Sequence, residues 1–248
     1  MIFVLRVPYN GLGDQLFYSP IPGLIKSRFP NSLVKVKLER GTRNTSIVNM
    51  VWKSNPYVDG ICTESDQQWP LPSIKKTQAD NILASFAKSL GLHCSENLLP
   101  EIHTKINLDE NFIGKIVVDL NYVSFVGGVS QKKLIRKFND PNIYFVNRPD
   151  WIEIGTNIQP TSLTHYASII KSSEEFHCLT SGGATLAAAL RKPSKCYFGR
   201  GQDKIFHHCD FHDYIEMSDY SMNSIMKLLK YKTYTRIKRK FLEITGDD

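Results

Sequence analysis

Short apolar runs rich in β-branched residues alternate along the chain with longer segments of helical periodicity. The strand-like runs occupy 2–7, 34–38, 60–62, 115–120, 143–147, 176–180 and 194–198. Apolar residues recur at helical spacing in 16–29, 44–53, 78–90, 162–172, 183–191 and 219–242. Strands that alternate with helices usually pair in parallel, with the helices covering the sheet. The sequence therefore predicts an α/β fold built on parallel sheets.

A polar stretch at 93–113 separates the first group of strands from the second. This stretch predicts an N-terminal domain at 1–110 and a C-terminal domain at 111–248. Each would be a small Rossmann-like unit, and the two would face each other across a cleft. Ligands of such sheets bind beyond the carboxyl ends of the strands, where loops and helix N-termini gather.

The net charge of +7 comes from one late segment of the chain. KLLKYKTYTRIKRK at 227–240 contains seven basic residues and no acid, and the remaining basic and acidic residues balance. Apolar residues follow one helical stripe through 222–241, so one face should pack on the protein. The segment predicts contact with a polyanionic partner through Lys238, Arg239 and Lys240. A basic helix face that meets only solvent is the alternative.

Three sequence features predict a cytoplasmic protein. No apolar run approaches the roughly 18 residues that a membrane span requires. The first apolar stretch ends at Arg6, too early for the core of a signal peptide. The five cysteines show no CxxC spacing, which favours reduced thiols. Peripheral contact with the inner face of a membrane stays open.

GLGDQ at 11–15 lies between the first predicted strand and the first predicted helix. Its glycines permit a tight turn, and the amides of such a turn point out of the helix N-terminus. Asp14 would stand near the helix start, where a carboxylate is favoured electrostatically. Two hypotheses follow. Asp14 is a helix cap, or it is a carboxylate in the cleft that takes a proton from a hydroxyl nucleophile.

The strand-like run at 176–180 leads into a second glycine-rich turn, TSGG at 180–183, followed by an alanine-rich helix. A turn of this kind can hold phosphate oxygens through backbone amides and the helix dipole. The alanines would let the helix lie close to the sheet. An ordinary tight turn between strand and helix is the alternative.

Together these segments resemble glycosyltransferase family 9, the ADP-heptose:lipopolysaccharide heptosyltransferase type. LRVPYNGLGDQLFYSPIPGLIKSRFPNSLVKV at 5–36 resembles the opening strand, G-D loop and first helix of that family. NPYVDGI at 55–61 resembles its Asn-Pro-Tyr-Val-Asp segment. The stretch at 162–199 resembles its block of helix, strand, Ser-Gly turn and alanine-rich helix. The resemblance implies a GT-B fold whose last helix crosses back toward the N-terminal half.

The resemblance also implies roles for particular residues. The N-terminal domain would take the acceptor, and Asp14 matches the position of the catalytic aspartate of the family. Gly13 and Gln15 would be neighbouring acceptor contacts. The C-terminal domain would bind a nucleotide sugar through Thr180, Ser181, Gly182, Gly183 and Thr185, with Lys132 as a further candidate. Transfer would invert the anomeric configuration, and no cofactor is expected, since the nucleotide sugar is a co-substrate.

Two positions depart from the family pattern. Thr180 stands where the family usually has Asp before Ser-Gly, and Thr185 stands where it usually has His. Because those family residues help to organise the diphosphate and sugar of the donor, the donor of this chain need not be ADP-heptose.

The sequence predicts no metal site. It contains no DxD pair of the kind that bridges a diphosphate through a metal ion. A late cluster of metal-binding residue types has a spacing that matches no structural zinc pattern: His207, His208, Cys209 and His212. We therefore expect a metal-independent enzyme.

The acceptor remains open. By analogy with the family it would be a bacterial surface glycan, polysaccharide, glycolipid or lipopolysaccharide core. The concentrated basic segment also suits DNA, so a transferase acting on hydroxymethylated bases of phage DNA is an alternative. A module that binds a nucleotide sugar without transferring it is a third hypothesis, prompted by Thr180 and Thr185.

Overall fold

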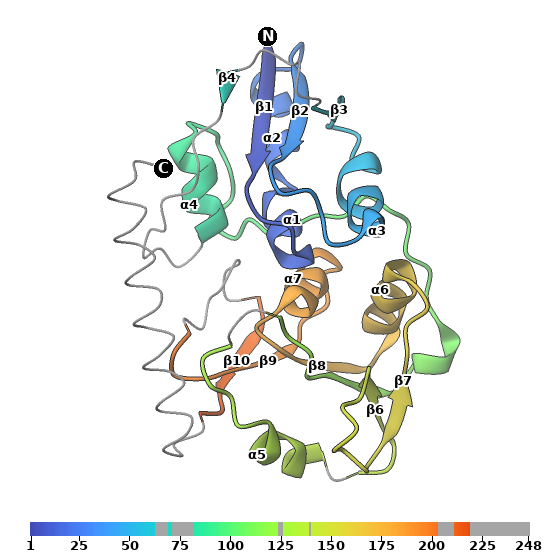
Figure 1. The fold of residues 1–248 in the computed structure, drawn as a ribbon. Coiled ribbons are helices and arrows are strands. Elements are labelled where there is room, and N and C mark those ends of the chain that lie inside the picture. Colours follow the sequence, from blue (N-terminus) through green and yellow to red (C-terminus); the bar gives the residue numbers. More distant parts are fainter. Residues whose placement is uncertain (63–68, 71–81, 124–125, 139, 203–210, 219–248) are drawn as a thin grey trace.

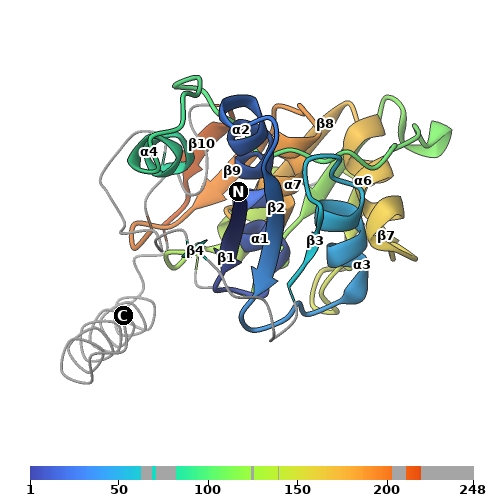
Figure 2. The ribbon, with the colours of Figure 1, turned by 90° about the horizontal axis from the view of Figure 1, so that it is seen from above.

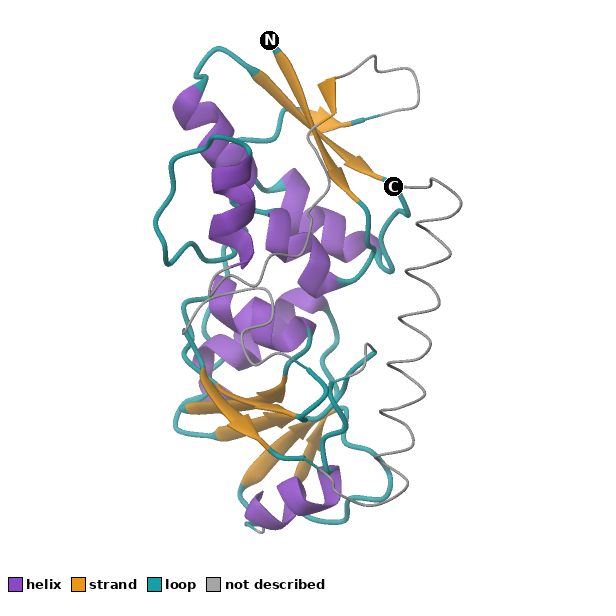
Figure 3. Cartoon of the chain, turned by 90° about the vertical axis from the view of Figure 1, so that its left-hand side faces the viewer, coloured by secondary structure: helices purple, strands orange, loops and turns teal. Residues whose placement is uncertain are grey.

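The computed structural model describes residues 1–62, 69–70, 82–123, 126–138, 140–202 and 211–218. Two parallel sheets stand at opposite ends of this part of the molecule, and helices from both halves pack between them (Figures 1 and 3). The predicted α/β fold with parallel sheets is confirmed.

The N-terminal sheet has the strand order β3-β2-β1-β4. Its strands are β1 (Ile2–Val7), β2 (Leu33–Leu38), β3 (Gly60–Ile61) and β4 (Trp69–Pro70), all parallel to their neighbours. Its helices are α1 (Leu12–Tyr18), α2 (Ile21–Arg28), α3 (Thr45–Val48), a π-helical turn (Asn49–Lys53) and α4 (Ile82–Ser89). The strands β1 and β2 lie between α4 on one side and α3 on the other (Figures 1 and 2).

The single helix predicted at 16–29 is two helices, α1 and α2, because prolines interrupt it. Pro20 and Pro22 have no amide N–H, so the hydrogen bonds to the carbonyls four residues earlier cannot form. The amide and the hydroxyl of Ser19 both donate to the carbonyl of Leu16 instead and close the end of α1. Pro22 then stands in the first turn of α2, where a missing N–H has no cost.

The C-terminal sheet has the strand order β10-β9-β8-β5-β6-β7, with parallel pairing throughout. Its strands are β5 (Ile116–Asp119), β6 (Ile143–Val146), β7 (Thr156–Ile158), β8 (Glu175–Leu179), β9 (Lys195–Phe198) and β10 (Asp213–Glu216). Its helices are α5 (Gln131–Ile135), α6 (Leu163–Ser172) and α7 (Gly182–Ala189). The helices α6 and α7 cover the face toward the N-terminal half, and α5 covers the opposite face (Figure 1).

The connection between the two sheets contains the 3-10 turn Glu110–Phe112, and the predicted boundary between 110 and 111 falls inside it. The ring of Phe112 packs edge to face against Tyr144 of β6, with ring centroids 5.9 Å apart. One apolar core cluster runs through both halves. It includes Leu5 and Leu16 from the first half and Phe176 and Leu186 from the second.

The final helix predicted at 219–242 lies outside the described residues, as do Lys238, Arg239 and Lys240. In the part of the chain that the structure describes, no helix combines the length and apolar character needed to cross a membrane. Four cysteines in that part are thiols rather than disulfides: Cys62, Cys94, Cys178 and Cys196.

Candidate functional site

The first turns of α1 and α7 touch where the two halves meet. A Cβ atom on Gly13 would lie 3.2 Å from the Cα of Gly182 and 3.2 Å from the hydroxyl oxygen of Thr185. A Cβ atom on Gly182 would lie 3.3 Å from the amide nitrogen of Gly13. Only glycine at both positions allows this approach without displacement. The contact brings the two predicted motifs, 11–15 and 180–183, to one place.

Asp14 is the third residue of α1, and its carboxylate accepts a hydrogen bond from the amide of Gly11 at the N-cap. A side chain at this position that reaches back to the N-cap amide satisfies a donor that the helix itself leaves without a partner. Asp14 therefore makes a capping contact, with Gly11 at the N-cap itself, and the hypothesis that this is its whole role stays a prediction. The contact is compatible with the hypothesis that Asp14 takes a proton from a hydroxyl group, because a carboxylate has further lone pairs.

The pKa of Asp14 lies above its usual value, chiefly because burial disfavours the charged form. The amide of Gly11 and the positive charge of Arg43 act in the opposite direction and lower it in part. Arg43 follows β2, and its Nε donates to the side-chain oxygen of Asn10 at 3.2 Å. A carboxyl with a raised pKa is a stronger base once ionised, which suits proton removal from a hydroxyl.

The turn after β8 presents the N-terminus of α7. Ser181 occupies the N-cap with extended backbone, and its side chain makes no capping hydrogen bond. The first turn of the helix is Gly182-Gly183-Ala184, three residues with no large side chain of their own. The N-termini of α1 and α7 thus converge, and both helix dipoles favour an anion between them.

Gln15 has a bracing role in the structure. The residue is fully buried, its side-chain amide donates to the carbonyl of Tyr9 at 2.6 Å, and its side-chain oxygen accepts from the indole N–H of Trp52. These contacts tie the start of α1, which carries Asp14, to the preceding loop and to Trp52. They support a structural role for Gln15 in place of the predicted direct contact with an acceptor.

The two threonines that depart from the family pattern are buried. The hydroxyl of Thr180 donates to the side-chain oxygen of Gln202. The hydroxyl of Thr185 donates to the carbonyl of Ser181 at 3.4 Å and faces Gly13 across the contact between the halves. Lys132, the other donor-site candidate, is exposed on α5, which lies on the opposite face of the sheet from α7.

Three residues near this place were not predicted from the sequence: Arg43, Asp119 and Tyr166. Asp119 ends β5 and is buried, and it accepts hydrogen bonds from Tyr166 of α6 and from Asn121. A carboxylate at the end of the buried run IVVD was the available signal, because the carboxyl ends of parallel strands form the ligand edge. Nothing in the sequence marks Arg43 or Tyr166.

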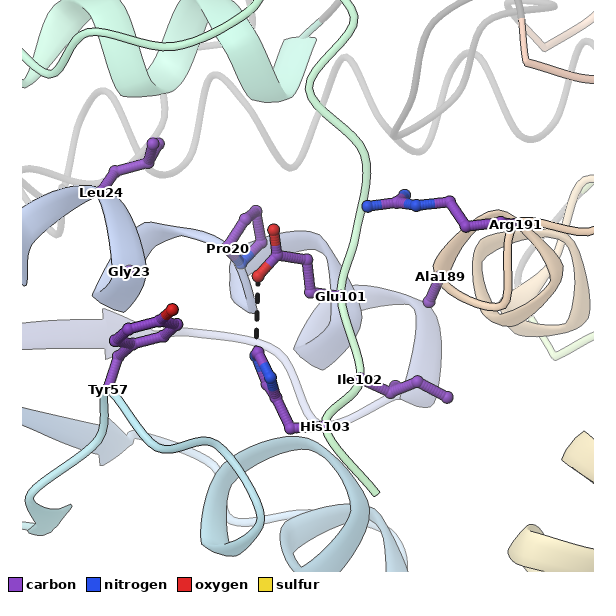
Figure 4. A pocket seen from close by; sticks show the side chains of 9 residues that line it. All are labelled: Pro20, Gly23, Leu24, Tyr57, Glu101, Ile102, His103, Ala189 and Arg191. Atoms are coloured by element: carbon purple, nitrogen blue, oxygen red, sulfur yellow. Dashed lines mark ion pairs between the residues drawn. The ribbon is translucent and has the colours of Figure 1, made fainter. Parts of the chain in front are cut away.

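A cavity of about 500 Å³ lies at the other end of the α1–α7 pair (Figure 4). Its walls come from α2, the end of α7 and the connection between the halves. On the wall formed by the connection, Glu101 and His103 form an ion pair at 3.5 Å, and Arg191 donates to the carbonyl of Pro100. Asp14 and the 180–183 turn do not line it, so its volume says nothing about the predicted donor site.

Within the described ranges, no three His, Cys, Asp or Glu side chains gather closely enough to hold a metal ion. His207, His208 and Cys209 lie outside those ranges. His212 is buried, and its Nε2 lies 2.9 Å from the carbonyl oxygen of Ala184 in α7. Metal independence stays a prediction.

No protein-family model matches the sequence, and no curated protein does either. Solved structures do match the fold. A glycosyl transferase of family 9 from Veillonella parvula aligns with 92% of this chain and 89% of its own length, at 10% identity and a TM-score of 0.63. Escherichia coli heptosyltransferase WaaC with ADP aligns with 93% and 99%, at 13% identity and a TM-score of 0.57.

A third match is the iron-containing dodecameric glycosyltransferase TibC of enterotoxigenic E. coli. It covers 85% of this chain and 61% of its own length, at 11% identity and a TM-score of 0.60. These likenesses confirm the predicted fold and the resemblance to family 9 structures at the level of the fold.

Proposed function

We propose that this chain is a glycosyltransferase that moves a sugar from a nucleotide-sugar donor to a hydroxyl group of an acceptor. The contact between Gly13 and Gly182 is the observation that carries the proposal. It sets a half-buried carboxylate beside the N-terminus of a helix that follows a parallel strand. Transfer to a hydroxyl needs both groups together, a base for the acceptor and a partner for the leaving diphosphate.

The donor diphosphate would lie at the first turn of α7. Backbone amides of Gly182 and Gly183 can donate to its oxygens, and the positive end of the helix dipole stabilises its charge. Ser181 has a hydroxyl that the helix does not use as a cap. That the neighbouring structures include an enzyme solved with ADP supports a nucleotide as the ligand.

The reaction balances without a covalent intermediate. Asp14 takes the proton of the acceptor hydroxyl as the oxygen attacks the anomeric carbon. The bond from that carbon to the diphosphate oxygen breaks, and its electron pair leaves with the nucleotide. The helix terminus stabilises the charge that grows on the diphosphate. Attack opposite to the leaving group inverts the anomeric configuration, and two helix N-termini provide the positive field without a metal ion.

An anionic acceptor fits the N-terminal side best. Arg43 is exposed and acts electrostatically on Asp14, so an acceptor with a negative group near its hydroxyl would meet a positive charge there. Bacterial surface glycans and lipopolysaccharide cores carry such groups. We propose an acceptor of this class.

A screen of thermal unfolding against ADP-, UDP-, GDP- and CMP-sugars tests the donor, because a ligand of the native state raises the apparent stability. Hydrolysis of the stabilising nucleotide sugar is then measured for the wild type, Asp14→Asn and the exposed control Glu110→Gln. We expect hydrolysis by the wild type and the control and a large loss in Asp14→Asn. Absence of stabilisation by every nucleotide sugar would overturn the proposal.

A further inference from the structure

Asp119 carries a buried carboxylate with an unusual set of partners. Its side chain is at the carboxyl end of β5, and the residue is 6% exposed. One carboxylate oxygen accepts from the amide and the side-chain amide of Asn121, each at 2.8 Å. The other accepts from the hydroxyl of Tyr166. Among the described residues, Asp119 forms no ion pair.

This carboxylate lies directly against the first turn of α7. A Cβ atom on Gly183 would lie 3.3 Å from the Oδ2 of Asp119 and 2.5 Å from the hydroxyl oxygen of Tyr166. A side chain at 183 would therefore displace the hydroxyl of Tyr166 or the turn itself. The carboxylate of Asp119 stands within one helical turn of the amides that would hold the donor diphosphate.

In the part of the chain that the structure describes, no positive side chain is among the groups that shift the pKa of Asp119 or form an ion pair with it. Titratable groups that do interact with Asp119 are Tyr166 of α6 and Cys178 of β8, which pairs with Asp119 in register. The helix α7 contributes no titratable residue. The pKa of Asp119 lies above its usual value, chiefly because burial disfavours the charged form, and its three hydrogen-bond donors offset this in part. The positive end of α7 also favours the charged form.

A negative charge in this position opposes a second anion at the same helix end. The carboxylate of Asp119 repels the nucleotide-sugar donor and the nucleoside diphosphate product to different degrees. In a nucleotide sugar each phosphate has one ester and one anhydride bond and a single negative charge, whereas the released nucleoside diphosphate has a terminal phosphate that carries an additional negative charge. The product is therefore opposed more strongly than the donor.

We propose that Asp119 weakens the binding of the nucleoside diphosphate product and so promotes its release. The inference rests on the proposed function, since it takes the α7 turn as the diphosphate site. Asp119 acts through its negative charge, which lowers the electrostatic potential at the N-terminal turn of α7, and takes no part in the reaction itself. The hydroxyl of Tyr166 holds the carboxylate in place.

Asp119→Asn removes the negative charge and keeps the size of the side chain. An asparagine at 119 can accept from Asn121 with its oxygen and donate to the hydroxyl oxygen of Tyr166 with its amide, while the proton of that hydroxyl loses its acceptor. The matched control is Asp213→Asn, which removes an exposed carboxylate at the amino end of β10, away from the turn. Thermal unfolding confirms that both variants fold.

The experiment measures the binding of ADP, UDP, GDP and CDP by calorimetry, and of the corresponding nucleotide sugars. We expect Asp119→Asn to bind the preferred nucleoside diphosphate about tenfold more tightly than the wild type does, and the nucleotide sugar more tightly by a smaller factor. Asp213→Asn should match the wild type. A purely structural role for Asp119 predicts weaker binding of both ligands.

Unchanged or weaker binding of the nucleoside diphosphate by a folded Asp119→Asn would overturn the inference and leave the proposed function intact. A larger gain for the nucleotide sugar than for the product would also overturn it. A wild-type protein that binds none of the nucleotides overturns both. Should Asp119→Asn not fold, Tyr166→Phe replaces it. Asp119 then keeps its proton to higher pH, and tighter binding of the product is expected again.

Discussion

Gly13 of α1 and Gly182 of α7 lie in direct contact across the two halves of the chain, with a Cβ position on Gly13 only 3.2 Å from the Cα of Gly182. Neither residue has a side chain to contribute. Their part in the site is to let two helix N-termini, one with Asp14 and one with the glycine-rich turn, approach more closely than any other residue pair would allow.

Gly13→Val should lower both stability and transfer. The branched side chain meets Gly182 and Thr185, and overpacking of this kind costs about 1–3 kcal/mol. Gly60→Ala is the control, because a Cβ atom there meets nothing within 4 Å. Thermal unfolding and donor turnover check the prediction. A fully active and stable Gly13→Val would show that neither stability nor transfer depends on the close contact between α1 and α7.

Asp14→Asn should lower turnover by roughly 10²-fold or more while nucleotide affinity stays near that of the wild type, since it removes a base and not a binding group. The pH profile carries a second test. Asp14 works only when ionised, and its pKa is raised by burial. Activity should therefore fall, as the pH drops, at a higher pH than an ordinary aspartate would give. Near-normal turnover in the variant would reduce Asp14 to a helix cap.

Arg43→Gln should move the acidic limb of the activity profile to higher pH. The guanidinium lowers the pKa of Asp14, so its loss lets the carboxyl hold its proton longer. Turnover well above the shifted limb should persist for an uncharged acceptor. Arg40→Gln, which removes a neighbouring exposed charge, is the control. An acidic limb at the same pH in Arg43→Gln and the wild type would show that Arg43 does not influence the pKa of the catalytic group.

Gly183→Ala should weaken nucleotide binding, because the added methyl group meets the hydroxyl of Tyr166 at 2.5 Å and displaces the turn. Removing that hydroxyl should make room. The double variant Gly183→Ala/Tyr166→Phe is expected to recover part of the lost stability, which a double-mutant cycle of unfolding free energies measures. Strictly additive effects would show that the two residues do not contact each other.

Transfer should survive treatment with EDTA, since helix termini and backbone amides provide the positive field at the diphosphate. Donor hydrolysis before and after dialysis against the chelator measures this. Activity that disappears and returns with Mg²⁺ or Mn²⁺, or with the iron named for TibC, would contradict the metal-free proposal.

The central strands were predictable because they are buried. The sequences of β1, β2, β5, β6, β8 and β9 are apolar runs that periodicity identifies. The edge strands β7 and β10 were missed, since Thr156–Ile158 and Asp213–Glu216 are short and mostly exposed. At an edge, backbone pairing to one neighbour suffices, and the residues need no apolar pattern.

The parts of the candidate site that come from one continuous segment of sequence were predictable. Both glycine-rich turns follow a strand and precede a helix, so their local sequence reveals them. Arg43, Asp119 and Tyr166 enter from three other elements, and only the packing of α1, α6 and α7 places them near the turns. The role of Gln15 was missed for the same reason, because its partner Trp52 is 37 residues away.

The apolar cluster that joins Leu5 and Leu16 to Phe176 and Leu186 makes the two halves thermodynamically dependent on each other. Separation of the halves would expose side chains that each half buries only in the presence of the other. The chain should therefore unfold in one cooperative transition in heat or denaturant. Either half expressed alone should expose apolar side chains and aggregate. The division at 110 and 111 into two domains stays a prediction, which the number of unfolding transitions tests.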